Sequence, residues 1–201
     1  MSTIFLTSTG LTDESIRNEF LRLVGLDRSR SVGIVTTAAS LKSENKYAKL
    51  AMEQFKEMGF SSVQFFDIET DPIHLLDLYS ILYVCGGNTF YLLYQIKKHH
   101  AEVALKNFLQ KENSFYIGVS AGSMILGPTI GLASLIDPDP NDVQLVDFTG
   151  LQVIDFEIHP HYETKHEQEL LSYEKEHSCR VVRLNDNQAL ILSNGEETLL
   201  G

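Results

Sequence analysis

SFYIGVSAG, at residues 114–122, narrows the choice of fold more than any other part of the sequence. Residues 114–119 form a mostly apolar run of the length of a buried strand, and the small residues from Ser120 onward begin a helix. Shorter apolar runs precede this one at residues 4–6, 32–36, 63–66 and 81–84, and stretches of helical spacing separate them. This alternation predicts an α/β fold, in which a doubly wound, mostly parallel sheet carries helices on both faces.

The connecting helices are predicted from apolar residues at helical spacing, over residues 12–26, 43–58, 88–99, 101–110 and 164–177, with a short helix opening at Pro72. After residue 128 the pattern is less regular. Residues 128–150 predict a long loop, and residues 153–158 alternate like a strand. Residues 181–184 and 189–192 predict a closing hairpin around Asn185-Asp186-Asn187. No repeat or linker interrupts the chain, so we expect one domain over residues 1–201.

The composition excludes several classes of function. The 201 residues include 27 acidic and 16 basic ones, for a formal net charge of −11. So acidic a chain disfavours nonspecific binding to nucleic acid and to anionic membrane surfaces. No apolar run is long enough for a membrane span, the first seven residues do not resemble a secretory signal, and the 2 cysteines make no disulfide framework. We therefore expect a cytoplasmic globular protein.

Ser120 is the candidate nucleophile. A serine at a sharp strand-to-helix turn exposes its hydroxyl above the carboxyl edge of the sheet, provided that its neighbours are small. Gly118, Ala121 and Gly122 meet that condition. The N–H groups at the start of the following helix point to the same place, where they would stabilise the negative charge of a tetrahedral intermediate. The other interpretation is a tight turn with small residues for packing alone.

Residues 86–90, GGNTF, directly follow the strand at 81–85 and end at the same predicted edge of the sheet as Ser120. Glycine permits close backbone approach, so the N–H of Gly87 is a candidate second oxyanion donor beside that of Ala121. Asn88 is suited to capping the next helix. A phosphate-binding loop is disfavoured, because neither of the usual glycine-rich phosphate motifs is present.

Of the 7 histidines, His159 and His161 follow a predicted strand, and histidine is the usual base for a serine nucleophile. The same two residues are spaced to share a metal ion on one face. No further ligand stands at a familiar zinc spacing, so we expect neither a metal nor a cofactor. The third interpretation is that the two histidines have a structural role, in packing or hydrogen bonding.

The base needs an orienting carboxylate. Asp186 lies in the predicted turn at 185–187, and Asp137 and Asp139 lie in the segment Ile136-Asp137-Pro138-Asp139. Residue spacing alone leaves all three open. An asparagine- and aspartate-rich turn is also ordinary hairpin chemistry, which is the structural interpretation of Asp186.

Together these segments resemble a known family. GGNTF at 86–90, YIGVSAG at 116–122, PTI at 128–130 and PHY at 160–162 occur in the order and approximate spacing of serine peptidase family S51, the peptidase E-like aspartyl dipeptidases. The resemblance spans about residues 6–199. It implies a fold like that of the class I glutamine amidotransferases, a flavodoxin-like arrangement. It also implies a serine peptidase with Ser120 as nucleophile, His161 as base and Asp186 as acid.

One segment departs from this family. Members selective for an N-terminal aspartate carry an arginine shortly after the histidine, and this chain has Lys165 and His166 near that place. A guanidinium binds a carboxylate with two hydrogen bonds, which neither residue reproduces. The resemblance therefore implies peptidase chemistry and leaves aspartate specificity in question, with His159 and His166 as candidate substrate-binding residues.

The sequence thus predicts a serine peptidase that hydrolyses small peptides as a monomer or homodimer. An esterase or amidase would use the same serine and would prefer Asp137 or Asp139 as its acid, because that class has the chain order serine, acid, histidine. A glutamine amidotransferase is disfavoured because the turn carries serine, while Cys85 lies within a strand pattern. A relative that cleaves acidic polymers would need a docking region that the chain lacks. A catalytically silent ligand-binding protein remains the alternative from another class.

Overall fold

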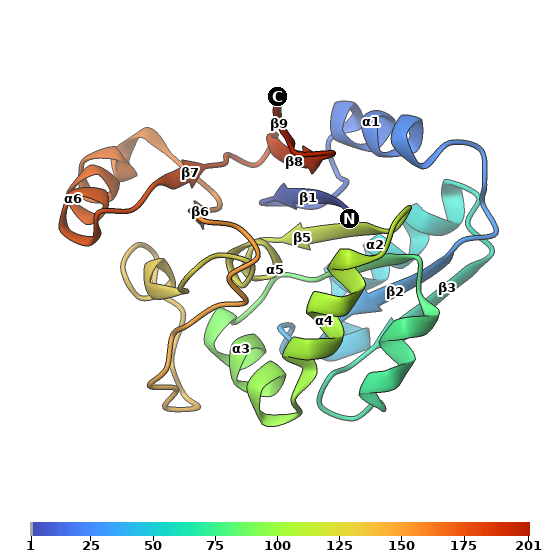
Figure 1. Ribbon diagram of the computed structural model, residues 1–201, viewed down its shortest axis with the longest axis horizontal. Coiled ribbons are helices and arrows are strands. Elements are labelled where there is room, and N and C mark those ends of the chain that lie inside the picture. Colours follow the sequence, from blue (N-terminus) through green and yellow to red (C-terminus); the bar gives the residue numbers. More distant parts are fainter. Residues whose placement is uncertain (1) are drawn as a thin grey trace.

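The computed structural model describes residues 2–201, and a seven-stranded sheet forms its centre (Figure 1). The order is β3-β2-β4-β5-β1-β8-β9. The strands are β1 Thr3–Thr7, β2 Ser31–Val35, β3 Ser62–Phe66, β4 Ile81–Val84, β5 Phe115–Val119, β8 Ala189–Ser193 and β9 Glu196–Leu200. The first five strands are parallel, whereas β8 is antiparallel to β1 and to β9. The predicted α/β fold with a mostly parallel sheet is therefore confirmed.

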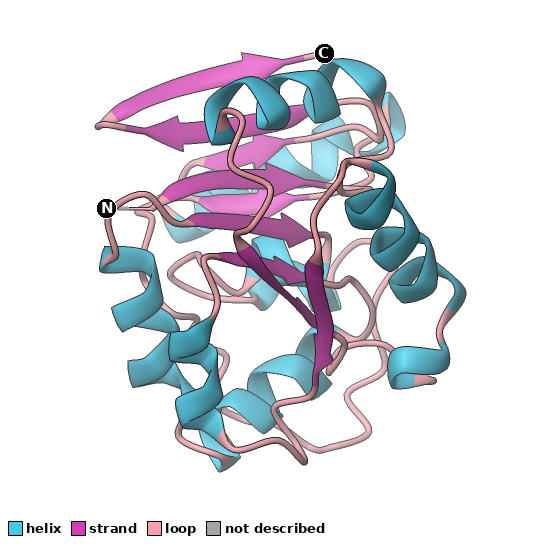
Figure 2. Cartoon of the chain, turned by 90° about the vertical axis from the view of Figure 1, so that its right-hand side faces the viewer, coloured by secondary structure: helices cyan, strands magenta, loops and turns pink. Residues whose placement is uncertain are grey.

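Helices cover both faces of this sheet (Figure 2). They are α1 Glu14–Val24, α2 Lys46–Glu57, α3 Thr89–Lys98, α4 Ala101–Gln110, α5 Ala121–Met124 and α6 Glu167–His177, with 3₁₀ helices η1 Lys42–Glu44, η2 Ile73–Leu78, η3 Gly131–Ser134 and η4 Thr164–His166. Helices α1 and α2 pack on one face, and α3 to α6 contribute to the apolar cluster of the other face.

The central strands are apolar throughout because both of their faces are buried. In β1, Phe5 joins the cluster beneath α1 and α2, whereas its neighbours Ile4 and Leu6 join the opposite cluster. The same alternation in β4 sends Tyr83 to one cluster and Val84 to the other. The residues that follow these strands then meet at the carboxyl edge of the sheet.

The predicted closing hairpin is wrong. Residues 181–183 form β7, which is parallel to β6 (Glu157–His159) in a separate two-stranded sheet. Figure 1 shows these two strands beside α6, to one side of the central sheet. The turn after β7 leads to β8 in the central sheet, and the actual hairpin joins β8 to β9 through Asn194 and Gly195, both with positive φ (53° and 82°).

Other predicted elements differ in extent. The helix predicted over 43–58 is divided between η1 and α2, and the helix after Ser120 ends at Met124. The strand predicted over 153–158 shortens to β6. Within the predicted loop at 128–150 lie η3 and an isolated antiparallel bridge between Thr129 and Thr149.

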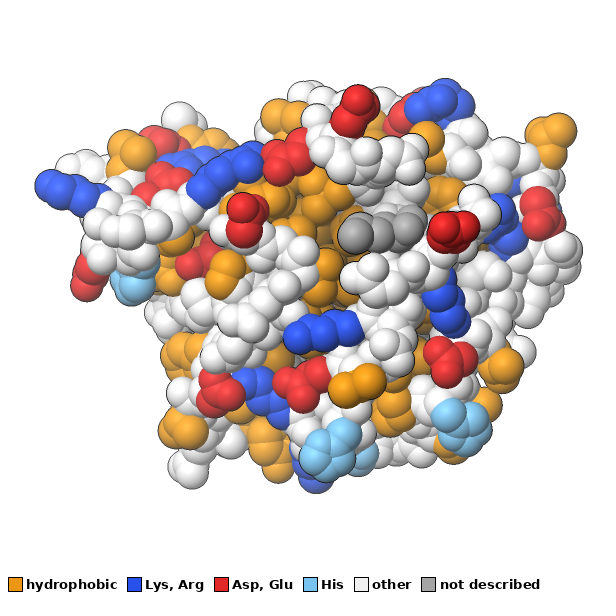
Figure 3. All heavy atoms as spheres, in the orientation of Figure 1, with side chains coloured by type: hydrophobic (Ala, Val, Ile, Leu, Met, Phe, Trp, Pro, Cys, Tyr) orange, Lys and Arg blue, Asp and Glu red, His pale blue; other side chains and the backbone are white. Residues whose placement is uncertain are grey.

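Two surface properties bear on function. Among residues 2–201, no helix is long and apolar enough to cross a membrane. On the face shown in Figure 3, acidic and basic side chains are interspersed, and no broad basic patch gathers there. That face therefore lacks the electrostatic footprint of a nucleic-acid-binding surface.

Candidate active site

A cavity of about 1080 Å³ lies at the carboxyl ends of the parallel strands. Its lining includes residues 8–9 after β1, 38–40 after β2, 85–88 after β4 and Ser120 after β5. In open parallel sheets this edge is the usual place for a ligand. His161 and Asp186 also line the cavity. His161 follows β6 of the two-stranded sheet, and Asp186 lies in the turn between β7 and β8.

Ser120 occupies a strained turn between β5 and α5. Its φ of 48° and ψ of −107° are unusual for a residue with a side chain, as expected of a nucleophile held at a sharp bend. The N–H of Ser120 donates to the carbonyl of Thr7 at 2.9 Å. A Cβ on Gly122 would lie 2.3 Å from the carbonyl oxygen of Val84, so the turn has room only for glycine there.

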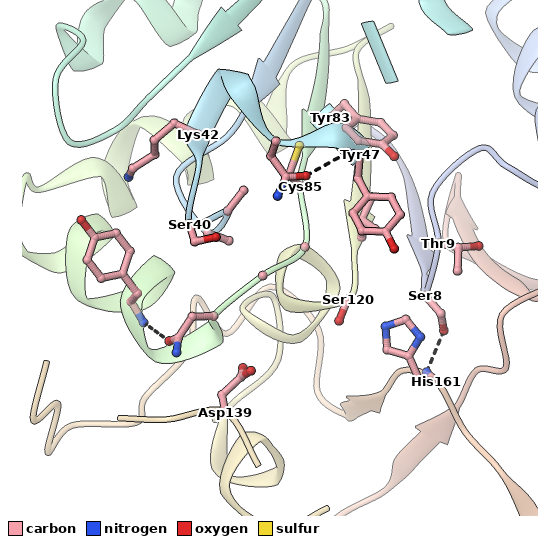
Figure 4. A pocket seen from close by; sticks show the side chains of 18 of the residues that line it. Ser8, Thr9, Ser40, Lys42, Tyr47, Tyr83, Cys85, Ser120, Asp139 and His161 are labelled. Atoms are coloured by element: carbon pink, nitrogen blue, oxygen red, sulfur yellow. Dashed lines mark hydrogen bonds between the residues drawn. The ribbon is translucent and has the colours of Figure 1, made fainter. Parts of the chain in front are cut away.

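Buried hydroxyls hold this turn to β1. The Oγ1 of Thr7 donates to the carbonyl of Gly118 at 2.7 Å. The N–H of Thr7 in turn donates to Ser123 Oγ at 2.9 Å, and that hydroxyl lies within hydrogen-bond distance of the Thr7 and Gly118 carbonyls. Neighbouring strands therefore fix the backbone of residue 120, and its side chain faces the cavity (Figure 4).

The glycine loop after β4 lies beside Ser120 at the edge of the cavity. Gly87 has a φ of 144°, and a Cβ at this position would lie 2.1 Å from the carbonyl oxygen of Ala38. The N–H of Asn88 donates to that same carbonyl at 3.0 Å. Asn88 caps α3 as predicted, since its Oδ1 accepts from the N–H of Tyr91 at 2.7 Å. Only glycine fits position 87, and the loop brings its backbone next to Ser120.

His161 and Asp186 form a direct pair. The distance between His161 Nδ1 and Asp186 Oδ1 is 2.7 Å, with the side chains 52% and 60% exposed. The N–H of His161 donates to Ser8 Oγ at 3.0 Å, and that hydroxyl donates to the Leu184 carbonyl at 2.9 Å. Thr9 Oγ1 likewise donates to the carbonyl of Asp186 at 2.7 Å. Residues 8 and 9 therefore position His161 and Asp186.

The imidazole of His161 lies beside Ser120 in the cavity (Figure 4). Among residues 2–201 no hydrogen bond joins the Ser120 hydroxyl to that ring. Such bonds are often loose in enzymes without substrate and tighten when substrate binds. With Nδ1 directed to Asp186, the Nε2 atom is the one left for the serine.

The other two candidate acids have different partners. Asp137 Oδ2 lies 3.7 Å from His166 Nε2. Asp139 Oδ2 accepts the N–H of Thr89 at 2.8 Å, at the start of α3. Neither of these two carboxylates pairs with His161, whose partner is Asp186. The structure therefore does not support the chain order serine, acid, histidine.

His159 and His166 line a second cavity of about 250 Å³, which shares Ser120 and His161 with the first. His159 Nε2 lies 3.1 Å from His166 Nδ1. Burial, together with the nearby His166 ring, lowers the pKa of His159 to about 4. His159 is therefore a neutral, buried partner of His166.

Sequence reasoning missed Ser8 and Thr9. The signal was a polar run directly after the first strand, but the hydrogen-bond partners lie more than 150 residues away in the chain. Cys85 also borders the cavity, and burial raises the pKa of its thiol to about 12. The thiol stays protonated at neutral pH and is a poor nucleophile.

Comparison with protein families gives a match over nearly the whole chain. The model of peptidase family S51 matches residues 4–200. The chain belongs to peptidase family S51. An uncharacterized peptidase of Pasteurella multocida is 30% identical to this S51 chain over 147 residues, which are 71% of this chain and 70% of that protein. A peptidase E of Salmonella paratyphi A is 25% identical over 218 residues, covering 100% of this chain and 90% of that protein.

Solved structures support the fold of this S51 member. A crystal structure described as a peptidase E protein from Listeria monocytogenes superposes with a TM-score of 0.82 at 23% identity, covering 100% of this chain and 98% of the other. A peptidase from an acI-B1 actinobacterium gives a TM-score of 0.72 at 18% identity, covering 100% and 88%. These structures show the fold class predicted from the sequence. Membership of family S51 makes the chain a peptidase, a hydrolase of the serine type.

Proposed function

We propose that this S51 member hydrolyses small peptides through Ser120, His161 and Asp186. The observation that carries the proposal is the 2.7 Å pair of His161 Nδ1 and Asp186 Oδ1 in the cavity that Ser120 borders. The carboxylate holds the ring proton on Nδ1, so Nε2 is free to accept the proton of the serine hydroxyl.

The reaction follows from these roles. Ser120 Oγ attacks the carbonyl carbon of the scissile peptide bond while His161 Nε2 takes its proton. The N–H groups of Gly87 and Ala121 stabilise the negative oxygen of the tetrahedral intermediate, where one missing donor costs about 2.7–4 kcal/mol. His161 then protonates the leaving amine, and water hydrolyses the acyl-enzyme by the same steps in reverse.

Asp139 is suited to recognise the substrate's amino terminus. It borders both cavities together with Ser120 and Gly87. Within residues 2–201, its side chain accepts one hydrogen bond, from the Thr89 N–H to Oδ2. A carboxylate near the nucleophile attracts the ammonium group of a peptide's first residue. This arrangement favours short peptides with a free amino terminus over blocked esters.

Active-site labelling tests the proposal against a silent binding protein. A fluorophosphonate probe should label the wild-type chain and the control Ser172→Ala, whose serine is exposed on α6. It should not label Ser120→Ala. On a panel of dipeptides, the wild type and Ser172→Ala should release free amino acids, and Ser120→Ala should not. Labelling that persists in Ser120→Ala, or a wild-type chain that neither reacts nor hydrolyses any dipeptide, contradicts the proposal.

A further inference from the structure

The small cavity beside Ser120 has a mixed lining. Apolar side chains of Met124, Leu132, Ala133 and Ile136 form one part of it. Besides Ser120 and His161, the polar part consists of Thr89, Asp137, Asp139, His159 and His166. Its volume of about 250 Å³ suits one amino-acid side chain, whereas the neighbouring cavity of about 1080 Å³ holds a longer group.

His166 places an unused hydrogen-bonding atom in this cavity. The residue is 5% exposed, and its buried Nε2 has no hydrogen-bond partner among residues 2–201. A buried polar atom without a partner costs free energy, which a ligand would recover by binding to it.

The partners of the other ring nitrogen define what Nε2 offers. The N–H of Glu163 donates to His166 Nδ1 at 3.2 Å, and His159 Nε2 lies 3.1 Å from the same atom. Since Nδ1 accepts a hydrogen bond, the hydrogen bonding assigns the ring proton to Nε2. His166 therefore presents an N–H donor to the cavity.

The charges around the donor define the ligand further. Asp137 Oδ2 lies 3.7 Å from His166 Nε2, and Asp139 is also part of the lining. No lysine or arginine lines this cavity within residues 2–201. A carboxylate ligand would face two carboxylates with no cation to balance it, while a cationic one would face the His166 donor.

We propose that this cavity binds the side chain of the residue whose carbonyl Ser120 attacks, and that His166 selects a neutral side chain with a hydrogen-bond acceptor, above all the carboxamide of asparagine. The amide oxygen accepts from His166 Nε2, and the amide nitrogen donates to Asp137. The inference rests on the proposed peptidase function and adds its substrate class.

The volumes of the two cavities assign the small one to the acyl side of the substrate. The ammonium group of a dipeptide lies on the same residue as the carbonyl under attack, and Asp139, which lines both cavities, is placed to bind it. The cavity of about 250 Å³ then takes the side chain of that first residue, and the leaving residue occupies the cavity of about 1080 Å³.

The first experiment compares kcat/KM for Asn-Leu, Asp-Leu, Ala-Leu and Lys-Leu. We expect Asn-Leu to exceed Asp-Leu and Ala-Leu by about tenfold or more, the effect of one buried hydrogen bond made or left unmade. A preference for Asp-Leu or Lys-Leu overturns the assignment of His166 as a neutral donor.

Variants assign that preference to His166. In His166→Phe the ratio of Asn-Leu to Ala-Leu should fall about tenfold, and in His166→Gln, which keeps a donor, it should be largely restored. His74→Phe, the same change at an exposed site on η2, should keep the wild-type ratio. A ratio equal to wild type in folded His166→Phe overturns the proposal. If that variant does not fold, His166→Gln and the wild-type ranking decide.

Binding measurements separate this inference from the peptidase function. Titration calorimetry with Ser120→Ala should show L-asparagine binding at least about tenfold more tightly than L-aspartate, and the difference should shrink in Ser120→Ala/His166→Phe. Ser120 labelling without any asparagine preference rejects the inference and keeps the peptidase. Asparagine binding in a chain that does not react with the fluorophosphonate rejects the peptidase and keeps the cavity assignment.

Discussion

Replacing Asp186 by asparagine gives the sharpest test of the proposed triad. Asp186 Oδ1 accepts from His161 Nδ1 over 2.7 Å. An asparagine amide at the same position has a donor to offer, which favours the tautomer with the ring proton on Nε2. That nitrogen then cannot take the proton of Ser120. The substitution changes the direction of one hydrogen bond and leaves the shape of the side chain almost intact.

The expected effects on rate and on stability differ widely. Loss of the correct tautomer in serine hydrolases costs about 10⁴ in kcat, and we expect a fall of about 10³–10⁴ here. Both side chains are more than half exposed, at 52% and 60%, so the pair contributes less than about 1 kcal/mol to folding. For a chain of this size, that corresponds to a change in Tm of at most about 2–4 °C.

Steady-state kinetics on the best dipeptide and a thermal melt measure the two effects. Asp155→Asn, an exposed aspartate outside both cavities, is the matched control and should keep wild-type kinetics. Asp137→Asn and Asp139→Asn should retain at least about tenfold more kcat than Asp186→Asn. A fall in kcat larger for either of them than for Asp186→Asn would refute the triad and restore the esterase-like order.

Three further substitutions probe neighbouring features. Gly87→Ala should lower kcat about 10²–10³-fold, because its Cβ would lie 2.1 Å from a backbone carbonyl and displace the oxyanion donor, whereas Gly25→Ala, with positive φ but open space, should keep kcat. Between pH 7 and pH 5, His159 takes up a proton in the unfolded chain but not in the folded chain, where its pKa is about 4. The free energy of unfolding, measured with urea, should therefore fall by about 2 kcal/mol over this range in the wild type and not in His159→Phe; equal falls in both proteins contradict this. Ser8→Ala leaves the His161 N–H without its acceptor, so the free energy of unfolding should fall by about 1–3 kcal/mol and kcat should fall too; an unchanged kcat would exclude a positioning role for Ser8.

The parallel half of the sheet was predictable because its strands are buried on both faces and therefore read as short apolar runs. Strand β9 gives no such signal, since residues 196–199 of this edge strand are exposed. The hairpin around residues 185–187 was predicted wrongly because two apolar runs separated by a turn look the same whether they pair or pass into different sheets. Tertiary contact decides between these, and β7 pairs with β6.

The candidate site shows a similar division. The local pattern around Ser120 predicted a sharp strand-to-helix turn, and the structure confirms it, with a φ of 48° at this residue. Residue patterns also predicted Gly87, and the family resemblance implied His161 and Asp186; the structure gathers all three around the same cavity. Residue patterns alone left three carboxylates open, because contact with His161 depends on how the chain crosses between sheets. The orientation of His166 Nε2 depends on a backbone N–H at Glu163, which residue types alone do not reveal.

Ser120 and its proposed partners come from different sheets. The serine is anchored in the central sheet by Thr7, whereas His161 follows the small β6–β7 sheet, and Ser8 Oγ links the two by accepting the His161 N–H. The spacing between the proposed nucleophile and its base is therefore set at the seam between two sheets. A substitution that shifts the β6–β7 sheet would separate the two groups while the central sheet stays folded.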